Sequence, residues 1–291
     1  PEKRLLFLAG KKPLGTLYAV HYLLENEFGV HWYLPDELGL VLPESDTLSV
    51  GRMDKIIAPE IPIRYIGSKK YREWSAFNGN NANLEELGGF VIFKHAHTFF
   101  DFVPPERYFD RHPEYFALVN GERTQKQLCT SNPEVARVAA DNILALLQER
   151  PEIGVVTLFP QDGNGFCECK ECRALDEDGL PGVEEINDSK WDQLGPEKYR
   201  SLSRRMVTFY LDVGDIVLGK DKNVILQVGA YSPYLYPPKE NSFQAPERMY
   251  IEMCHGWDHN HPIESDDSEI NKRFRKALFE WKKIFENVSI Y

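Results

Sequence analysis

The sequence predicts a mixed α/β protein built on a (β/α) barrel of the TIM type, preceded by a small α/β domain. Two observations lead to this fold class. Beyond Pro59, short apolar strands alternate with longer amphipathic helices, which is the rhythm of a parallel sheet or barrel. Before Pro59 the elements are shorter and broken by polar loops. A chain of 291 residues can hold a small and a larger domain, and we expect them at residues 1–58 and 59–291.

The first domain is expected to hold one helix between short strands. The helix opens at Gly15 and Thr16, buries one apolar face, and ends at Gly29 because glycine adopts the left-handed conformation that closes helices. Strands are expected at 4–9, 31–34 and 47–50.

The second domain is expected to hold five or six of the eight strands of a barrel, so the remaining C-terminal strands and any leader peptide would lie outside this sequence. Strands are expected at 63–66, 90–93, 155–159, 224–228 and 249–253, with another beginning at 288–291. Helices are expected at 135–147, 199–218 and 273–285. The polar segment 173–195 has no hydrophobic period and predicts a long loop.

Composition excludes several functional classes. The formal net charge is −11 and no stripe of Lys and Arg is present, so a nucleic-acid partner is not expected. No apolar run approaches the roughly 20 residues of a membrane-spanning helix. The five cysteines are too few for a disulfide scaffold.

Polar and aromatic side chains follow four of the predicted strands. In a barrel, catalytic groups lie on the loops after the carboxyl ends of the strands, so these positions are candidates for a binding site. The groups are Lys94, His95 and His97; Gln161, Asp162 and Asn164; Tyr231, Tyr234 and Tyr236; and His255, Trp257, Asp258, His259 and His261.

Three carboxylates are candidate catalytic residues. Glycoside hydrolysis usually needs two, one to protonate the leaving oxygen and one to act as nucleophile or to stabilise charge; in some enzymes the substrate's N-acetyl group attacks instead. Asp162 follows a buried strand and stands among glycines, although an Asp-Gly turn would have the same sequence. Its partner would be Asp258 or Glu252, with a slight preference for Asp258 because Glu252 lies within a strand.

Histidine and aromatic residues are candidates for binding sugar. His95 and His97 share one face of a predicted extended segment, and hydrogen bonds to sugar hydroxyls are favoured over a metal site because no His-Glu-x-x-His motif occurs. Trp257 offers an indole face for stacking on a pyranose ring. The remaining candidates for substrate binding are Gln161, Asn164, Tyr231 and His255.

Cys167, Cys169 and Cys172 form the most conspicuous spacing in the chain. A knuckle of this kind holds structural zinc when a second pair of ligands is available, but Cys129 and Cys254 lie elsewhere in the sequence. A structural zinc ion and a disulfide are therefore both open, and neither reading makes these cysteines catalytic. No other cofactor is expected.

Several strings resemble one known family. They are Gly15 to Val20, Gly29 to Tyr33, His112 to Leu118, Gln127 to Cys129, Asn132 to Val135, and Gln161-Asp162-Gly163 through Cys172. The small first domain resembles those that precede the barrel in several glycosidases, and the later strings resemble the domain of unknown function 4838. Some members of that family are placed in glycoside hydrolase family 163.

The resemblance implies a retaining endo-β-N-acetylglucosaminidase that acts on complex N-glycans. Such proteins are typical of Bacteroidetes and are exported to the periplasm or the cell surface, so the implied partner is an oligosaccharide or a glycoprotein glycan. Between Cys254 and His261 the family pattern has a Glu before a His-Pro, where this chain offers Asp258 as the nearest carboxylate. A glycan-binding relative without catalysis and a cysteine–metal module remain alternatives.

Overall fold

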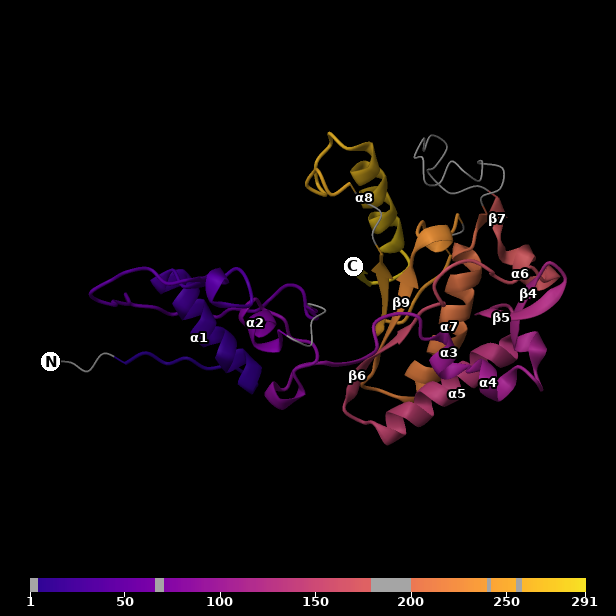
Figure 1. Ribbon diagram of the computed structural model, residues 1–291, viewed down its shortest axis with the longest axis horizontal. Helices are drawn as coiled ribbons and strands as arrows, with labels where there is room; N and C mark the ends of the chain where they lie inside the picture. Colours follow the sequence, from indigo (N-terminus) through magenta and orange to yellow (C-terminus); the bar gives the residue numbers. More distant parts are fainter. Residues whose placement is uncertain (1–4, 66–70, 179–199, 240–241, 255–257) are drawn as a thin grey trace. The chain divides into compact units, whose positions relative to one another are not determined.

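The chain folds into two compact units, residues 1–92 and 93–291. The computed structural model describes residues 5–65, 71–178, 200–239, 242–254 and 258–291 (Figure 1). The unit boundary falls within strand β3 (Val91–Phe93). The boundary expected after residue 58 therefore lies inside the first unit.

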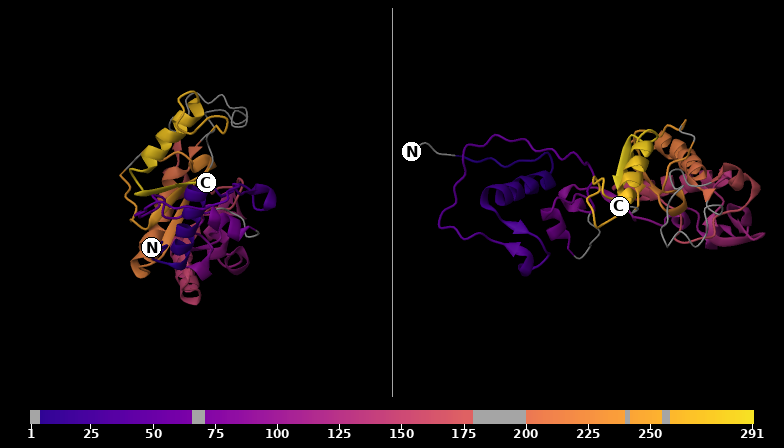
Figure 2. Two further views of the ribbon diagram at one scale, coloured as in Figure 1. Left: turned by 90° about the vertical axis from the view of Figure 1, so that its left-hand side faces the viewer. Right: turned by 90° about the horizontal axis from the view of Figure 1, so that it is seen from above.

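The first unit is organised around helix α1, drawn in indigo in Figures 1 and 2. Pro13 is the first residue of α1, where its missing N–H costs nothing, and Gly29 ends it at φ 70° as expected from the sequence. A small core of Leu14, Ala76 and Leu84 joins α1 to α2. The elements of this unit are α1 (Pro13–Phe28), β1 (His31–Trp32), β2 (Leu40–Val41) and α2 (Arg72–Phe77), with β1 and β2 antiparallel.

Three strands expected from the sequence among residues 1–92 are absent from the described residues. Residues 5–9 and 47–50 form no strand, and neither do residues 63–65. The apolar side chains of the first segment face outward, with Leu5 at 73% and Phe7 at 83% exposure. An apolar run becomes a strand only when another strand pairs with it, and no described residue of this unit does so.

The second unit is built on a five-stranded sheet with the order β11-β10-β9-β6-β3. Its pairs β6–β9, β9–β10 and β10–β11 are parallel, which confirms the central parallel sheet expected from the sequence. Neighbours in the sheet follow the order of the sequence without a reversal, and the described strands do not close into a barrel. The bounds are β6 (Ile153–Leu158), β9 (Ile225–Ala230), β10 (Met249–Met253) and β11 (Asn287–Ile290).

Helices pack against the apolar face of this sheet. Helix α7 approaches β9 and β10 at Gly214, where any larger side chain would overlap Met249. Helix α5 lies beside α7 (Figure 1), and Asn132 caps its first turn by accepting a hydrogen bond from the Glu134 N–H. The α-helices described in the second unit are α3 (Phe99–Phe102), α4 (Pro105–Tyr108), α5 (Pro133–Glu149), α6 (Lys170–Leu175), α7 (Ser203–Lys220) and α8 (Glu269–Trp281).

A hairpin before α5 was not predicted from the sequence. It consists of β4 (Phe116–Val119) and β5 (Glu122–Leu128), which are antiparallel. All residues of β5 except Leu128 are polar, so it lacks the alternation of apolar and polar residues that marks a half-buried strand. The segment 173–195 was expected to be a loop throughout, but its first residues belong to helix α6 and to the short strand β7 (Glu177–Asp178). Residues 179–195 lie outside the described residues. Strand β8 (Arg200–Ser201), which pairs with β7, follows the segment.

Gly229 offers a test of how closely the sheet is packed. A Cβ atom there would lie 2.4 Å from the ring of Phe159, which is buried and rigid. We predict that Gly229→Ala lowers the free energy of unfolding by about 1–3 kcal/mol, as overpacking does. The matched control is Gly219→Ala in α7, where nothing lies within 4 Å and alanine should stabilise the helix slightly. Equal stability of the two variants in urea denaturation would contradict this packing.

Candidate functional site at the carboxyl edge of the sheet

The carboxyl ends of the parallel strands bring a buried carboxylate next to a histidine. Glu252 is the fourth residue of β10, and His95 lies two residues after β3. Glu252 Oε1 lies 3.4 Å from His95 Nε2, within ion-pair distance. The side-chain amide of Gln227, in β9, donates a hydrogen bond to Glu252 Oε2. Side chains from β9 and from the segment after β3 thus meet at the Glu252 carboxylate in β10.

Strand alternation explains why Glu252 points away from the helices. Its neighbours Ile251 and Met253 are fully buried on the face that packs against α7, so Glu252 takes the opposite face. Gln227 shares that face, because its register partner Tyr250 lies two residues from Glu252. Glu252 is only 5% exposed and Gln227 only 8%. A buried carboxylate needs polar partners, and the amide of Gln227 is one of them.

The remaining oxygen of Glu252 is available for further bonding. Glu252 Oε1 accepts no hydrogen bond from any described residue and faces His95. The short contact with the Glu252 side chain raises the pKa of His95, and the carboxylate charge adds to this effect, while burial opposes it. The His95 ring also packs near Tyr291, with 5.1 Å between ring centroids. Glu252 therefore favours the protonated form of the His95 ring.

Backbone strain gathers at the same edge. Lys94 and His97, after β3, have φ values of 48° and 58°, and Ser232, after β9, has a φ of 50°. Non-glycine residues in this left-handed region cost about 1–3 kcal/mol each and cluster at functional sites. The strain also corrects one expectation: the segment from His95 to His97 is not extended, so the two histidines do not share one face.

Asp162 lies on an exposed turn after β6. Its Oδ1 accepts a hydrogen bond from the Gly163 N–H at 2.9 Å, and Gly163 has a φ of 88°, so the turn expected from the sequence is present. The neighbouring Gln161 is fixed by Gln127, whose side-chain amide bonds the Gln161 carbonyl at 2.6 Å and N–H at 3.2 Å. The loop that carries Asp162 is thereby held to strand β5.

A cavity of about 490 Å³ opens beside this loop. The buried Oε1 of Gln161 has no hydrogen-bond partner among the described residues, and its side chain lines the cavity. The lining does not include Glu252, His95 or Asp162, but it includes residues adjacent to His95 and Asp162 in the sequence. Its lining residues are Lys94, His97, Phe100, Asp101, Pro105, Glu106, Gln125 and Gln161.

Asp258, the partner preferred from the sequence, is engaged in its own loop. Its carboxylate accepts hydrogen bonds from the Asn260 N–H at 2.9 Å and the Ser268 hydroxyl at 3.1 Å, and it pairs with His261 at 2.9 Å. The Asn260 bond is the main reason why the pKa of Asp258 falls to about 2. These contacts fix the loop that leads into α8, and the low pKa makes Asp258 a poor proton donor at neutral pH.

The other predicted residues divide between exposed positions and the undescribed segment. Tyr231 is 39% exposed, and Asn164 is exposed on the turn that follows Asp162. His255 and Trp257 lie outside the described residues. The residues that the structure does bring together are therefore His95 with Glu252, and His97 with Gln161.

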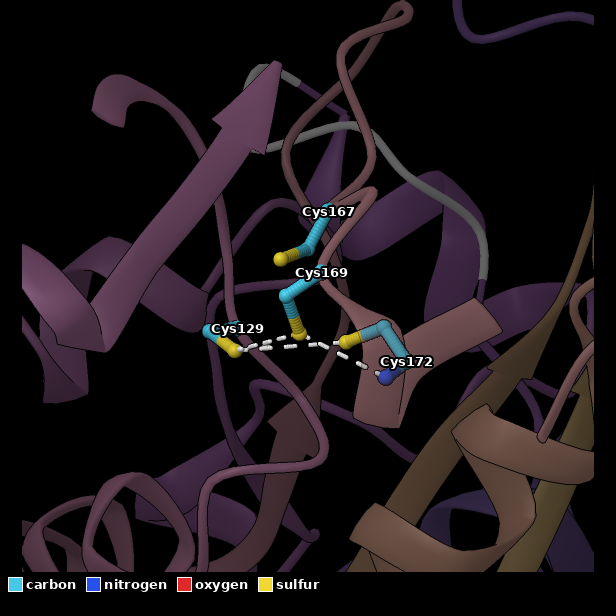
Figure 3. A group of neighbouring side chains, drawn as sticks. All are labelled: Cys129, Cys167, Cys169 and Cys172. Carbon is cyan, nitrogen blue, oxygen red and sulfur yellow. Dashed lines mark hydrogen bonds between the residues drawn. The ribbon is translucent and has the colours of Figure 1, made fainter. Parts of the chain in front are cut away.

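A second cluster lies behind the Asp162 turn. Cys129 joins the three cysteines of the predicted knuckle, although it precedes them by an entire helix and strand (Figure 3). The ligand atoms of Cys129, Cys167, Cys169 and Cys172 all lie within 4.8 Å of one another, and we call them the four-cysteine cluster. All four are buried free thiols, so the disulfide alternative is not formed here. Hydrogen bonds from Cys129 and Cys167 lower the pKa of Cys172.

Comparison with known protein families finds one match. Residues 34–291 match the family described as domain of unknown function (DUF4838). The chain belongs to this family. Comparisons with curated proteins and with solved structures gave no match. None of the helices among the described residues combines the length and apolar composition of a membrane-spanning segment.

Two functional candidates were missed in the sequence. Gln227 is a polar residue within the apolar strand Ile225–Ala230, and a buried polar side chain in such a run is a signal that could have identified it. Cys129 has no such signal, because only the folding of β5 against the loop after β6 brings it to the other thiols.

The His95–Glu252 pair can be tested by titration. We predict that the pKa of His95, followed by NMR of its ring protons, lies above 6.5 and falls in Glu252→Gln, because burial then acts without a carboxylate to oppose it. A raised histidine pKa stabilises the folded protein below pH 6.5, and this contribution is lost as the pH rises through the folded-state pKa. An unchanged His95 pKa in the variant would refute the pairing.

Proposed function

We propose that this protein is a glycoside hydrolase that uses Glu252 as a catalytic carboxylate on glycans containing N-acetylglucosamine. The observation that carries the proposal is the buried Glu252 at the carboxyl edge of a parallel sheet, oriented by Gln227 and paired with His95. The family match supplies no activity, so the proposal depends on this geometry.

We further propose that the five-stranded sheet is part of a (β/α) barrel. Doubly wound sheets reverse their strand order at a switch point, whereas barrel strands follow one another in sequence order. The order from β3 to β11 is of the second kind. The polar row of Thr157, Gln227 and Glu252 on the face away from α7 supports the same view, since that face would line the barrel.

The environment of Glu252 suits a carboxylate that acts on a developing positive charge. Glycoside hydrolysis passes through an oxocarbenium-like transition state, which a fixed carboxylate stabilises or attacks. Gln227 donates a hydrogen bond to one oxygen of Glu252. The carboxylate therefore needs little reorientation during the reaction. The other oxygen, on the His95 side, remains able to face the anomeric carbon.

Asp162 is the proposed partner of Glu252. It follows β6, and β9 lies between β6 and the strand of Glu252, so both carboxylates belong to the same edge of the sheet. Asp162 would protonate the leaving oxygen, or would hold the acetamido group if the substrate's own N-acetyl group attacks. Asp258 is less suited because its oxygens are already engaged and its pKa is about 2.

The neighbouring cavity provides a subsite for sugar hydroxyl groups. The unpartnered Oε1 of Gln161 is a hydrogen-bond acceptor, and Lys94 and His97 add polar atoms to the lining. Phe100 contributes an aromatic surface of the kind on which a pyranose ring packs. This chemistry is consistent with an exported protein that encounters glycoprotein glycans. Export to the periplasm or the cell surface stays a prediction.

Substitution of the carboxylates tests the activity. We predict that Glu252→Gln lowers the rate of glycan release from a glycoprotein by about 10²–10⁴-fold, because the amide keeps the shape of the side chain but not its charge. Asp162→Asn should lower the same rate by orders of magnitude. Both variants should still bind the glycan, as measured by calorimetry.

Glu247→Gln is the matched control, because it makes the same chemical change in an exposed residue before the amino end of β10. It should leave the rate unchanged. Circular dichroism should show that all three variants remain folded. Near-normal release by a folded Glu252→Gln variant would rule out Glu252 as the catalytic carboxylate. Binding without release by the unaltered protein would instead favour a non-catalytic glycan-binding relative.

A further inference from the structure

The four-cysteine cluster joins three segments that are distant in the sequence. Cys129 lies between β5 and α5, Cys167 and Cys169 lie in the loop between β6 and α6, and Cys172 lies in α6. Their exposures are 4%, 1%, 7% and 0% in the same order. Figure 3 shows the sulfur atoms of Cys129, Cys169 and Cys172 converging, with Cys167 to one side. The proposed hydrolase chemistry uses none of them.

Two of the distances between these sulfur atoms match those between ligands around one metal ion, and all of them lie within 4.8 Å. Cys129 Sγ lies 3.7 Å from Cys169 Sγ and 3.9 Å from Cys172 Sγ. Sulfur atoms at about 2.3 Å from a tetrahedral zinc ion are about 3.8 Å from one another, by the geometry of the tetrahedron. A disulfide would bring two of them to about 2.05 Å. The arrangement thus requires little movement to enclose an ion.

Backbone N–H groups donate hydrogen bonds to two of the four sulfur atoms. The Leu118 N–H donates to Cys167 Sγ at 3.3 Å, and the Cys172 N–H donates to Cys169 Sγ at 3.4 Å. Such outer hydrogen bonds orient metal-bound thiolates and spread their charge. The buried guanidinium of Arg205 donates a hydrogen bond to the Cys167 carbonyl at 2.8 Å and is itself paired with the buried carboxylate of Asp176, which fixes the backbone beside the cluster.

Ordinary apolar packing is a weaker explanation for the four thiols. Free cysteines are often buried as small apolar residues, and they then fill gaps between larger side chains. Here the buried core that contains the cluster has Ala117 as its other member, with Leu118 and Val119 only partly buried around it. This small core adds little apolar surface of its own between the hairpin, the loop and the helix. A bound ion would cross-link these three segments.

We propose that the four-cysteine cluster binds one structural zinc ion. Sites with four sulfur ligands in a tetrahedron select zinc or iron, and zinc needs no redox partner for a structural role. The ion would fasten the hairpin β4–β5 and helix α6 to the loop after β6. The Glu168 N–H already donates a hydrogen bond to the Leu118 carbonyl at 2.7 Å, which links the loop after β6 to the hairpin. The ion would thereby stabilise the loop that carries Gln161 and Asp162.

Metal analysis of the purified protein tests this proposal directly. Protein expressed in medium that contains both zinc and iron should carry about one zinc ion per chain, as measured by mass spectrometry of the elements. Protein prepared with cobalt should show the visible bands of tetrahedral Co²⁺ and the strong ultraviolet charge-transfer band of four thiolates. Protein without zinc should unfold at a lower temperature.

Single substitutions identify the ligands. Cys129→Ser should lose at least tenfold in zinc affinity and weaken the cobalt charge-transfer band. Cys254→Ser is the matched control, because Cys254 is a free thiol outside the cluster, and it should keep one zinc ion per chain. Bound iron in place of zinc, no bound metal, or full zinc binding by Cys129→Ser would overturn the proposal. The measurements on unaltered protein remain decisive if the variant fails to fold.

Discussion

The parallel alignment of β6, β9, β10 and β11 is the constraint on which the rest of the structure depends. The carboxyl ends of parallel strands all lie at one edge of the sheet, so residues that are distant in the sequence come together there. Their register places Gln227 two positions from the partner of Glu252 and lets the amide reach the carboxylate. The opposite face of the sheet is buried against α7, so the polar side chains of Gln227 and Glu252 lie on the other face.

That edge combines features that a purely structural sheet does not need. A buried carboxylate costs free energy unless it is well paired, and strained backbone at Lys94, His97 and Ser232 adds to the cost. Proteins retain such features where they serve binding or catalysis. The proposed glycosidase function explains these features together, since a fixed carboxylate, a histidine with a raised pKa and a polar cavity all suit a sugar substrate.

The sequence predicted the parts of the fold whose hydrophobic period is strong. The helix at 135–147 and the strand at 249–253 lie where the sequence placed them, because their apolar faces pack on the core of the second unit. The short strands of the first unit were predicted less well, since an apolar run gives no information about a pairing partner. The hairpin β4–β5 is polar on its outer face, and its existence depends on contacts with the loop after β6.

The candidate site was predicted as a set of strand ends, and its internal connections were not. The sequence predicted that His95, Asp162 and a carboxylate from Asp258 or Glu252 lie at one end of the sheet, but the pairing of His95 with Glu252 depends on where β3 ends and on the turn at Lys94. The low pKa of Asp258 arises from hydrogen bonds within its own loop, which no spacing reveals. Cys129 joins the other thiols only through tertiary contacts.

The central claim is that ligands bind at the carboxyl edge of this sheet. The most direct measurement is a two-dimensional amide NMR titration of the labelled protein with an oligosaccharide that contains N-acetylglucosamine. We expect shifts concentrated at the residues after β3 and β6 and at the end of β10, including His95, Gln161 and Glu252. Residues before the amino ends of the strands, such as Glu152 and Glu247, should not shift. Saturable shifts confined to those amino ends, or no shifts at millimolar ligand, would contradict it.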